Sequence, residues 1–382
     1  MSRRKNLGSL VLAALVAVLL AAPLAADWES GIAAFKAGDL AGAEAEFRAL
    51  TEERPDWAGG HLMLGQTLLR DRRVDEALPF LERAHELAPQ DLNTALVLGQ
   101  TYVQLERFGD AARVMQGHDP ASLPAAQKTA FYRTRAIAAV HSGQEVKAIE
   151  DLEAAIELAP EDADLHRQLA QAARGAGLTA VAVEHYNHAL ELDPNDVAAT
   201  RALAQLLYDR AVSAGAGAQA GLCRDVVPHA RRLVKLDESY ENLVLLGEAA
   251  RCAGLNEIAE SALELALAQR SDEWWPHFAL GRAQARLGKW TAAEAALKTA
   301  IAKNVPEKDK AAVVKQLGYV YERQGRLDKA LAHYSLAGDA EGVQRVEQNL
   351  IAREEEEVLA RLAEEKRRIE EELRRLEGEG GL

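Results

Sequence analysis

Apolar residues recur at steps of three and four along most of the chain, which is the pattern of helices that bury one face. In residues 58–91 this pattern predicts two short helices, the second of which is ended by Pro89. The small and apolar positions are Leu64, Gly65 and Leu68 in the first helix and Ala77, Leu81 and Ala84 in the second. Neither helix can bury its apolar stripe alone, so the segment predicts neighbouring copies of itself.

The pattern of two short helices repeats from Asp27 to about Asp339, with a period of 34 residues wherever two regular copies adjoin. The copies span residues 24–57, 58–91, 92–119, 129–162, 163–196, 197–239, 240–273, 274–307 and 311–340. We therefore predict an all-α solenoid of about nine helix pairs in residues 27–340, whose core grows by stacking.

The spacing of small and apolar residues in these copies resembles the tetratricopeptide repeat, W-x2-L-G-x2-Y followed by A-x3-F, A and P. The matching residues are Leu98, Gly99, Tyr102 and Ala111; Leu280, Gly281, Ala293, Leu297 and Ala300; Leu317, Gly318, Tyr321, Ala330, Tyr334 and Ala337; and the closing Pro55, Pro89, Pro160 and Pro194. The chain resembles an exported bacterial member of this family. The resemblance implies antiparallel helix pairs stacked into a right-handed superhelix with a concave face.

Two copies depart from the pattern. Gly117, Pro120 and Pro124 predict that the third copy ends early and that residues 116–126 form a loop. In the sixth copy, residues 214–222 (AGAGAQAGL) are an insertion between the two helices, and we expect its glycines to make it flexible.

The N-terminus has the pattern of a secretory signal peptide. Arg3, Arg4 and Lys5 precede an apolar run over residues 7–22, and small residues follow to Ala26. We predict that residues 1–26 are removed on export, most simply to the periplasm. The alternative is that an uncleaved helix anchors the chain in a membrane, which is the only membrane contact that we expect.

After Asp339 the composition becomes strongly charged. Residues 341–377 place Leu359, Leu362, Lys366, Ile369, Leu373 and Leu376 at alternating steps of three and four, a coiled-coil seam of nearly three heptads. We predict a helix whose start caps the last repeat through Val343, Val346 and Leu350, and whose later part forms a weak homodimer. The alternative is a solvated helix. We expect residues 378–382 to be disordered.

The chain offers little support for catalysis. It lacks HExxH, GxSxG, Walker A and CxxC motifs, so we expect no enzyme activity, no cofactor and no metal centre. His185 and His188 lie three residues apart and could hold a metal loosely, but histidines on a helix surface explain them more simply. The net charge of −14 disfavours binding to nucleic acid.

The two cysteines are Cys223, placed at the start of the second helix of the sixth copy, and Cys252, at the end of the first helix of the seventh. In a stacked repeat array these helices are antiparallel neighbours, so the two ends lie side by side. We predict a disulfide between them, as an exported protein permits; the alternative is two buried thiols.

In the tetratricopeptide family, the first helix of each repeat lines the concave face. The residues at the corresponding positions include Arg133, Arg167, Gln171, Arg174, Arg201, Gln205, Tyr208, Arg282 and Lys315. Arginine binds carboxylates through two hydrogen bonds, so we predict a groove for a protein or peptide partner with acidic groups. The alternative is that these arginines pair with acidic neighbours such as Asp164, Glu241 and Glu248.

We therefore expect a protein–protein interaction scaffold that binds peptide segments, in cell-envelope assembly or secretion. The alternative is a structural spacer that assembles through its C-terminal helix.

Overall fold

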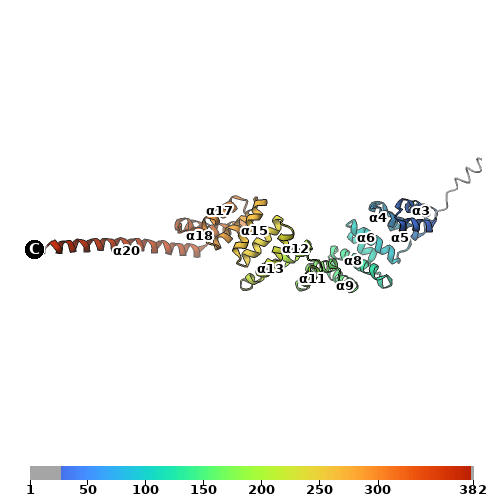
Figure 1. Cartoon of the computed structure of the whole chain (residues 1–382), viewed down its shortest axis with the longest axis horizontal. Coiled ribbons are helices and arrows are strands. Elements are labelled where there is room, and N and C mark those ends of the chain that lie inside the picture. The colour runs from blue at the N-terminus through green and yellow to red at the C-terminus, as the bar shows by residue number, and fades with distance from the viewer. Residues whose placement is uncertain (1–26, 380–382) are drawn as a thin grey trace, which may run out of the picture. The chain divides into compact units, whose positions relative to one another are not determined.

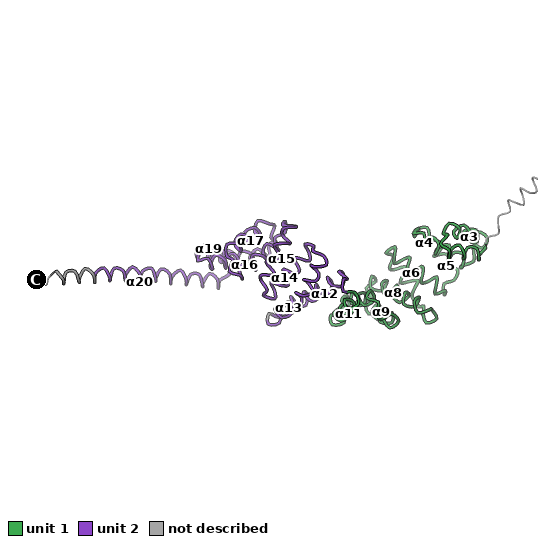
Figure 2. The backbone as a smooth tube through the Cα atoms, in the orientation of Figure 1, with its two compact units in different colours: residues 1–193 green, residues 194–382 purple. Residues whose placement is uncertain are grey.

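The computed structural model describes residues 27–379, and every regular element in this range is a helix (Figure 1). This confirms the predicted all-α repeat architecture. The chain divides into two compact units, Met1–Asp193 and Pro194–Leu382 (Figure 2). The predicted signal peptide, residues 1–26, lies outside the described residues.

Unit 1 consists of consecutive helices that pack as antiparallel pairs. They are α2 (Trp28–Ala37), α3 (Leu40–Glu53), α4 (Ala58–Arg70), α5 (Val74–Leu87), α6 (Leu92–Gln104), α7 (Phe108–Met115), η1 (Pro120–Ser122), α8 (Ala125–His141), α9 (Glu145–Leu158), α10 (Ala163–Gly175) and α11 (Thr179–Leu192). The break in the third repeat falls as predicted, because α7 stops at Met115 and only the short η1 turn interrupts the connection to α8.

Unit 2 continues the same arrangement and ends in a long helix. Its helices are α12 (Val197–Ser213), α13 (Ala216–Leu236), α14 (Tyr240–Cys252), α15 (Asn256–Gln269), α16 (Trp274–Arg286), α17 (Trp290–Ala302), α18 (Glu307–Arg323), α19 (Leu327–Leu336) and α20 (Ala340–Glu379). In the described part of the chain, no helix is long and apolar enough to cross a membrane.

The sixth-repeat insertion corrects one expectation. The glycines of residues 214–222 predict a flexible linker, but α13 begins at Ala216 and takes most of these residues into its first turns. Only Ala214 and Gly215 keep an extended conformation, with ψ at 153° and 151°. The alanines that alternate with glycine favour the helix strongly enough to offset the glycines. Cys223 therefore lies within α13 and not at its start.

In six of the repeats, the two helices interlock through a glycine and a large residue that follows it by sixteen positions. A Cβ atom on Gly65 would lie 2.5 Å from Leu81 Cδ2, too close for any side chain. The other pairs of this kind are Gly31 with Phe47, Gly99 with Met115, Gly247 with Leu263, Gly281 with Leu297 and Gly318 with Tyr334. The missing side chain on one helix thus makes the space that the partner helix fills.

Helix α20 has two parts with different surroundings. Val346 is fully buried, and Val343 and Leu350 pack beside it against the core of the last repeat, which includes Leu317 and Tyr334. From Ile351 to Ile369 every side chain is exposed. The helix reaches Glu379, two residues beyond the predicted end at 377, and residues 380–382 lie outside the described range.

Candidate functional site

The predicted groove residues of unit 1 are partly used within the chain. Arg133 forms an ion pair with Asp162, and Arg167 forms one with Asp164. Gln171 and Arg174 lie exposed on α10. For Arg167 the structure therefore supports the alternative interpretation, in which an acidic neighbour neutralises the arginine.

The predicted residues on α12 are also bonded internally. Arg201 Nη2 lies 2.7 Å from Asp237 Oδ2, and Gln205 Nε2 donates to Asp209 Oδ1 at 2.8 Å. The Tyr208 hydroxyl donates to Glu248 Oε2 at 3.3 Å. The contacts of Arg201 and Tyr208 join α12 to the end of α13 and to α14, whereas the Gln205 bond lies within α12.

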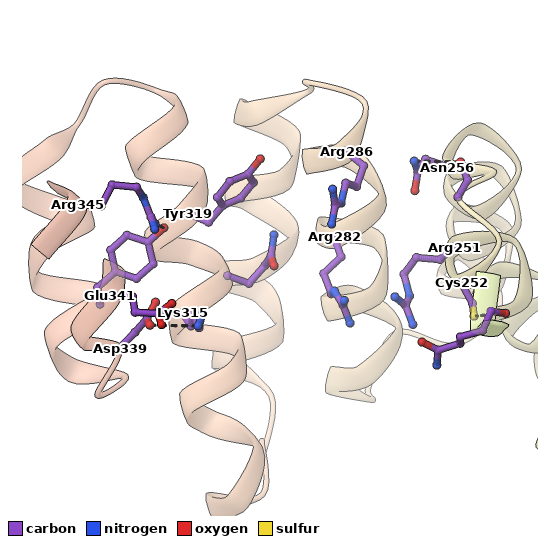
Figure 3. Close-up of a pocket in the computed structure, with 14 residues that line it drawn as sticks. Arg251, Cys252, Asn256, Arg282, Arg286, Lys315, Tyr319, Asp339, Glu341 and Arg345 are labelled. Carbon is purple, nitrogen blue, oxygen red and sulfur yellow. Dashed lines mark hydrogen bonds and ion pairs between the residues drawn. The ribbon is translucent and has the colours of Figure 1, made fainter. Parts of the chain in front are cut away.

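The remaining two predicted residues, Arg282 and Lys315, meet in a pocket of about 700 Å³ in unit 2 (Figure 3). Its lining side chains come from α13, α14, α15, α16, α18, α19 and α20. The charged residues of its wall are Arg251, Arg282, Arg286, Lys315, Arg345, Asp339 and Glu341. Cations outnumber carboxylates on this wall, in a protein whose net charge is −14.

Three of the pocket's cations are held by carboxylates. Arg251 Nη2 lies 2.8 Å from Glu248 Oε2, and Lys315 Nζ lies 3.1 Å from Asp339 Oδ1. Arg345 forms a bidentate ion pair with Glu322, in which Nε donates to Oε1 at 2.8 Å and Nη2 donates to Oε2 at 2.9 Å. The Glu322 carboxylate also accepts a hydrogen bond from the Tyr334 hydroxyl. These three cations are thereby fixed in position.

Arg282 and Arg286 differ from those three cations. They lie one turn apart on α16, and no carboxylate of the described residues is within ion-pair distance of either guanidinium. Arg282 packs over the Phe278 ring at 5.5 Å. Burial lowers the pKa of Arg282, and the positive charge of Arg251 lowers it further. Figure 3 shows Arg282 and Arg251 side by side, from neighbouring helices.

The sequence interpretation named Arg282 and Lys315 as binding residues but left Arg286 and Arg345 out. Arg286 could have been found from its spacing, because it lies one helical turn after Arg282 and so shares its face. Arg345 belongs to the capping helix, which carries no groove position in the family pattern. Only the packing of α20 against α19 brings it to the pocket.

The disulfide joins Cys223 of α13 to Cys252 of α14, with Cα atoms 5.7 Å apart. Cys223 is fully buried, whereas Cys252 lies on the pocket wall beside Arg251. The crosslink therefore fixes the end of α14 that carries one of the pocket's cations.

Some histidines of unit 1 contact backbone carbonyl oxygens and so have a structural role. His166 Nε2 lies 3.0 Å from the Pro160 carbonyl oxygen, which can only accept, so Nε2 carries the proton. His166 Nδ1 then accepts from His185 Nδ1, 3.0 Å away. His61 of the same unit and His277 of unit 2 make the equivalent contact to a carbonyl six residues earlier. In the part of the chain that the structure describes, no group of three or more His, Cys, Asp or Glu residues could hold a metal ion.

Several comparisons bear on the family. Tetratricopeptide-repeat family models match residues 29–92 and 278–342, residues 68–123, and residues 163–206. A comparison with curated proteins finds no match.

Solved structures with related repeats include a MamA protein, at 23% identity over 47% of this chain and 91% of that chain, with a TM-score of 0.40. MamA 41-end from Desulfovibrio magneticus RS-1 is 19% identical over 46% and 94%, with a TM-score of 0.39. The P58(IPK) TPR domain is 18% identical over 85% and 97%, with a TM-score of 0.27. These scores are too low to add an argument about function. The family matches, together with the interlocked helix pairs, show that the chain belongs to the tetratricopeptide-repeat family.

Proposed function

We propose that this protein is an interaction scaffold that binds an acidic peptide segment of a partner protein in the pocket of unit 2. The family supports the general role, because its helix repeats present surfaces for other proteins. Membership of this family also agrees with a non-enzymatic function.

The observation that carries the proposal is the pair Arg282 and Arg286. Both guanidiniums face a pocket and lack a carboxylate partner among the described residues, while the surrounding cations are paired. Guanidinium binds carboxylate through two parallel hydrogen bonds, so an acidic side chain of a ligand would complete the site. Glu341 also lines the pocket and limits how many carboxylates it accepts.

Peptide binding tests the proposal. A fluorescent Glu-rich peptide and its Gln-substituted counterpart would be titrated with the wild-type chain and with Arg282→Glu/Arg286→Glu. We expect the Glu-rich peptide to bind more tightly than the Gln peptide, and the double variant to weaken its binding by about tenfold or more.

A matched control is Arg210→Glu/Arg224→Glu, which makes the same charge change at two exposed arginines outside the pocket wall. Binding by this control should stay close to the wild-type value. If both double variants lose binding equally, attraction is nonspecific and the pocket is not the site. Circular dichroism would confirm that both variants keep their helix content.

We also propose that the chain is exported, to the periplasm, where its partners are segments of cell-envelope proteins. The basic and apolar pattern of residues 1–26 supports export, and a disulfide between Cys223 and Cys252 is compatible with an oxidising compartment. Mass spectrometry of the mature N-terminus tests the proposal: a chain that begins at Asp27 agrees with it, and an intact Met1 in a membrane fraction favours the anchored alternative.

A further inference from the structure

The exposed part of α20 carries an apolar seam that nothing in the described chain covers. Leu359, Leu362 and Ile369 are 65%, 57% and 53% exposed. The sequence continues the same spacing with Leu373 and Leu376. In heptad terms these residues, with Lys366, occupy the a and d positions that pack together in a coiled coil.

Most of the positions that flank this seam are acidic, and the two that are not are apolar. With Leu359 at a, the e and g positions are Glu356, Val358, Ala363, Glu365, Glu370, Glu372 and Glu377. No lysine or arginine occupies an e or g position over this stretch. All the arginines of residues 353–375 fall at positions b and c, away from the seam.

Two further glutamates have a different role. Glu357 and Glu364 occupy position f, opposite the seam, and lie near arginines of the same helix. Arg353 Nε lies 3.8 Å from Glu357 Oε1, and Arg368 Nη2 lies 3.4 Å from Glu364 Oε1. Pairs at this spacing support an isolated helix, so the arginines at b and c stabilise α20 itself.

These flanks oppose self-association. In a parallel pair of two copies, g positions face e positions of the partner, so Glu365 would face Glu370. In an antiparallel pair, e faces e and g faces g, which again brings glutamates together. Like charges at these positions are the means by which coiled coils reject a partner.

We propose that the seam of α20 binds an amphipathic helix of another protein whose own seam is flanked by lysine or arginine at e and g. The apolar side chains supply the contact area, and the acidic flanks select a basic partner over a second copy of this chain. The interaction uses a surface separate from the pocket, so each of the two proposals can be tested independently of the other.

Two designed helical peptides test this proposal. Both carry the same leucine seam and length, one with lysine and the other with glutamate at every e and g position. We expect the full chain to bind the lysine peptide at least about tenfold more tightly than the glutamate peptide at neutral pH. Leu362→Asp/Ile369→Asp should abolish binding of the lysine peptide, which separates seam packing from general attraction to a basic peptide.

A charge reversal and its matched control sharpen the test. Glu356→Lys/Glu365→Lys changes two flanking positions and should reduce or reverse the preference for the lysine peptide. Glu357→Lys/Glu364→Lys makes the same change at position f and should leave the preference in place, with helix content checked by circular dichroism. Equal binding of the two peptides, no binding of either, or a neutral-pH homodimer that Leu362→Asp/Ile369→Asp dissociates would each overturn the proposal.

Discussion

Cys223 of α13 and Cys252 of α14 are joined by a disulfide whose second cysteine forms part of the pocket wall in unit 2. The bond closes a loop with a sequence separation of 29 residues, which restricts the unfolded chain. On the chain-entropy model, the loop contributes about 3–4 kcal/mol to the free energy of unfolding.

We therefore predict that reduction, or Cys223→Ala/Cys252→Ala, lowers the unfolding free energy by about 3–4 kcal/mol, less whatever strain the bond adds. Denaturant titration of oxidised and reduced protein measures the difference. The cysteine-free variant is the control for the reductant, because reductant should leave its stability unchanged. Equal stability of oxidised and reduced wild-type protein would contradict the prediction.

The glycine interlock gives a second prediction. Gly65→Ala places a methyl group against Leu81, so we expect it to destabilise the chain by about 1–3 kcal/mol. The double variant Gly65→Ala/Leu81→Ala should lose less stability than the sum of the losses of the two single variants, because the two changes share one space. Gly221→Ala is the matched control: a Cβ on this glycine inside α13 would meet no neighbouring atom within 4 Å, so alanine should stabilise the helix by about 0.5–1 kcal/mol. Thermal or denaturant unfolding compares all four variants with the wild-type protein.

Acid stability follows from Glu294 of α17. Burial raises the pKa of Glu294, but hydrogen bonds from Lys298 and Gln324 and the charges of Lys298 and Arg326 outweigh burial and lower it to about 2. Because the folded pKa lies below the ordinary glutamate value of 4.5, the carboxylate stabilises the fold above pH 4.5 and this contribution is lost as pH falls toward 2.

Glu294→Gln should therefore lower the melting temperature at neutral pH and flatten its decline between pH 4.5 and 2. Glu355→Gln, on the exposed part of α20, serves as the control and should leave both the melting temperature and its decline unchanged. Parallel acid profiles of wild type and Glu294→Gln would show that Glu294 does not carry this dependence.

The sequence determined the repeat architecture because its signal is local. A glycine and a large residue sixteen positions later belong to one repeat, so Gly281 and Leu297 can be read together without knowing the stack. The prediction for the insertion was wrong for a local reason as well, since it weighed the glycines above the alanines that extend α13.

The candidate site was harder to predict, because charge pairing depends on neighbours that are distant in sequence. Arg167 and Asp164 are three residues apart, and the alternative of internal pairing included them. Arg201 and Asp237 are separated by 36 residues and meet only when α12 stacks beside the start of α14. The spacing rules identify residues on a face but do not tell which of their charges are already neutralised.

The interlock between Gly65 and Leu81 has a consequence for how such chains change length. Both members of each pair lie inside one repeat, so duplicating or deleting a whole repeat carries the recess and the side chain that fills it together. A break within a repeat would separate them and leave either a void or a clash. The number of repeats can therefore vary while, inside each such repeat, the large side chain still fills the space above the glycine.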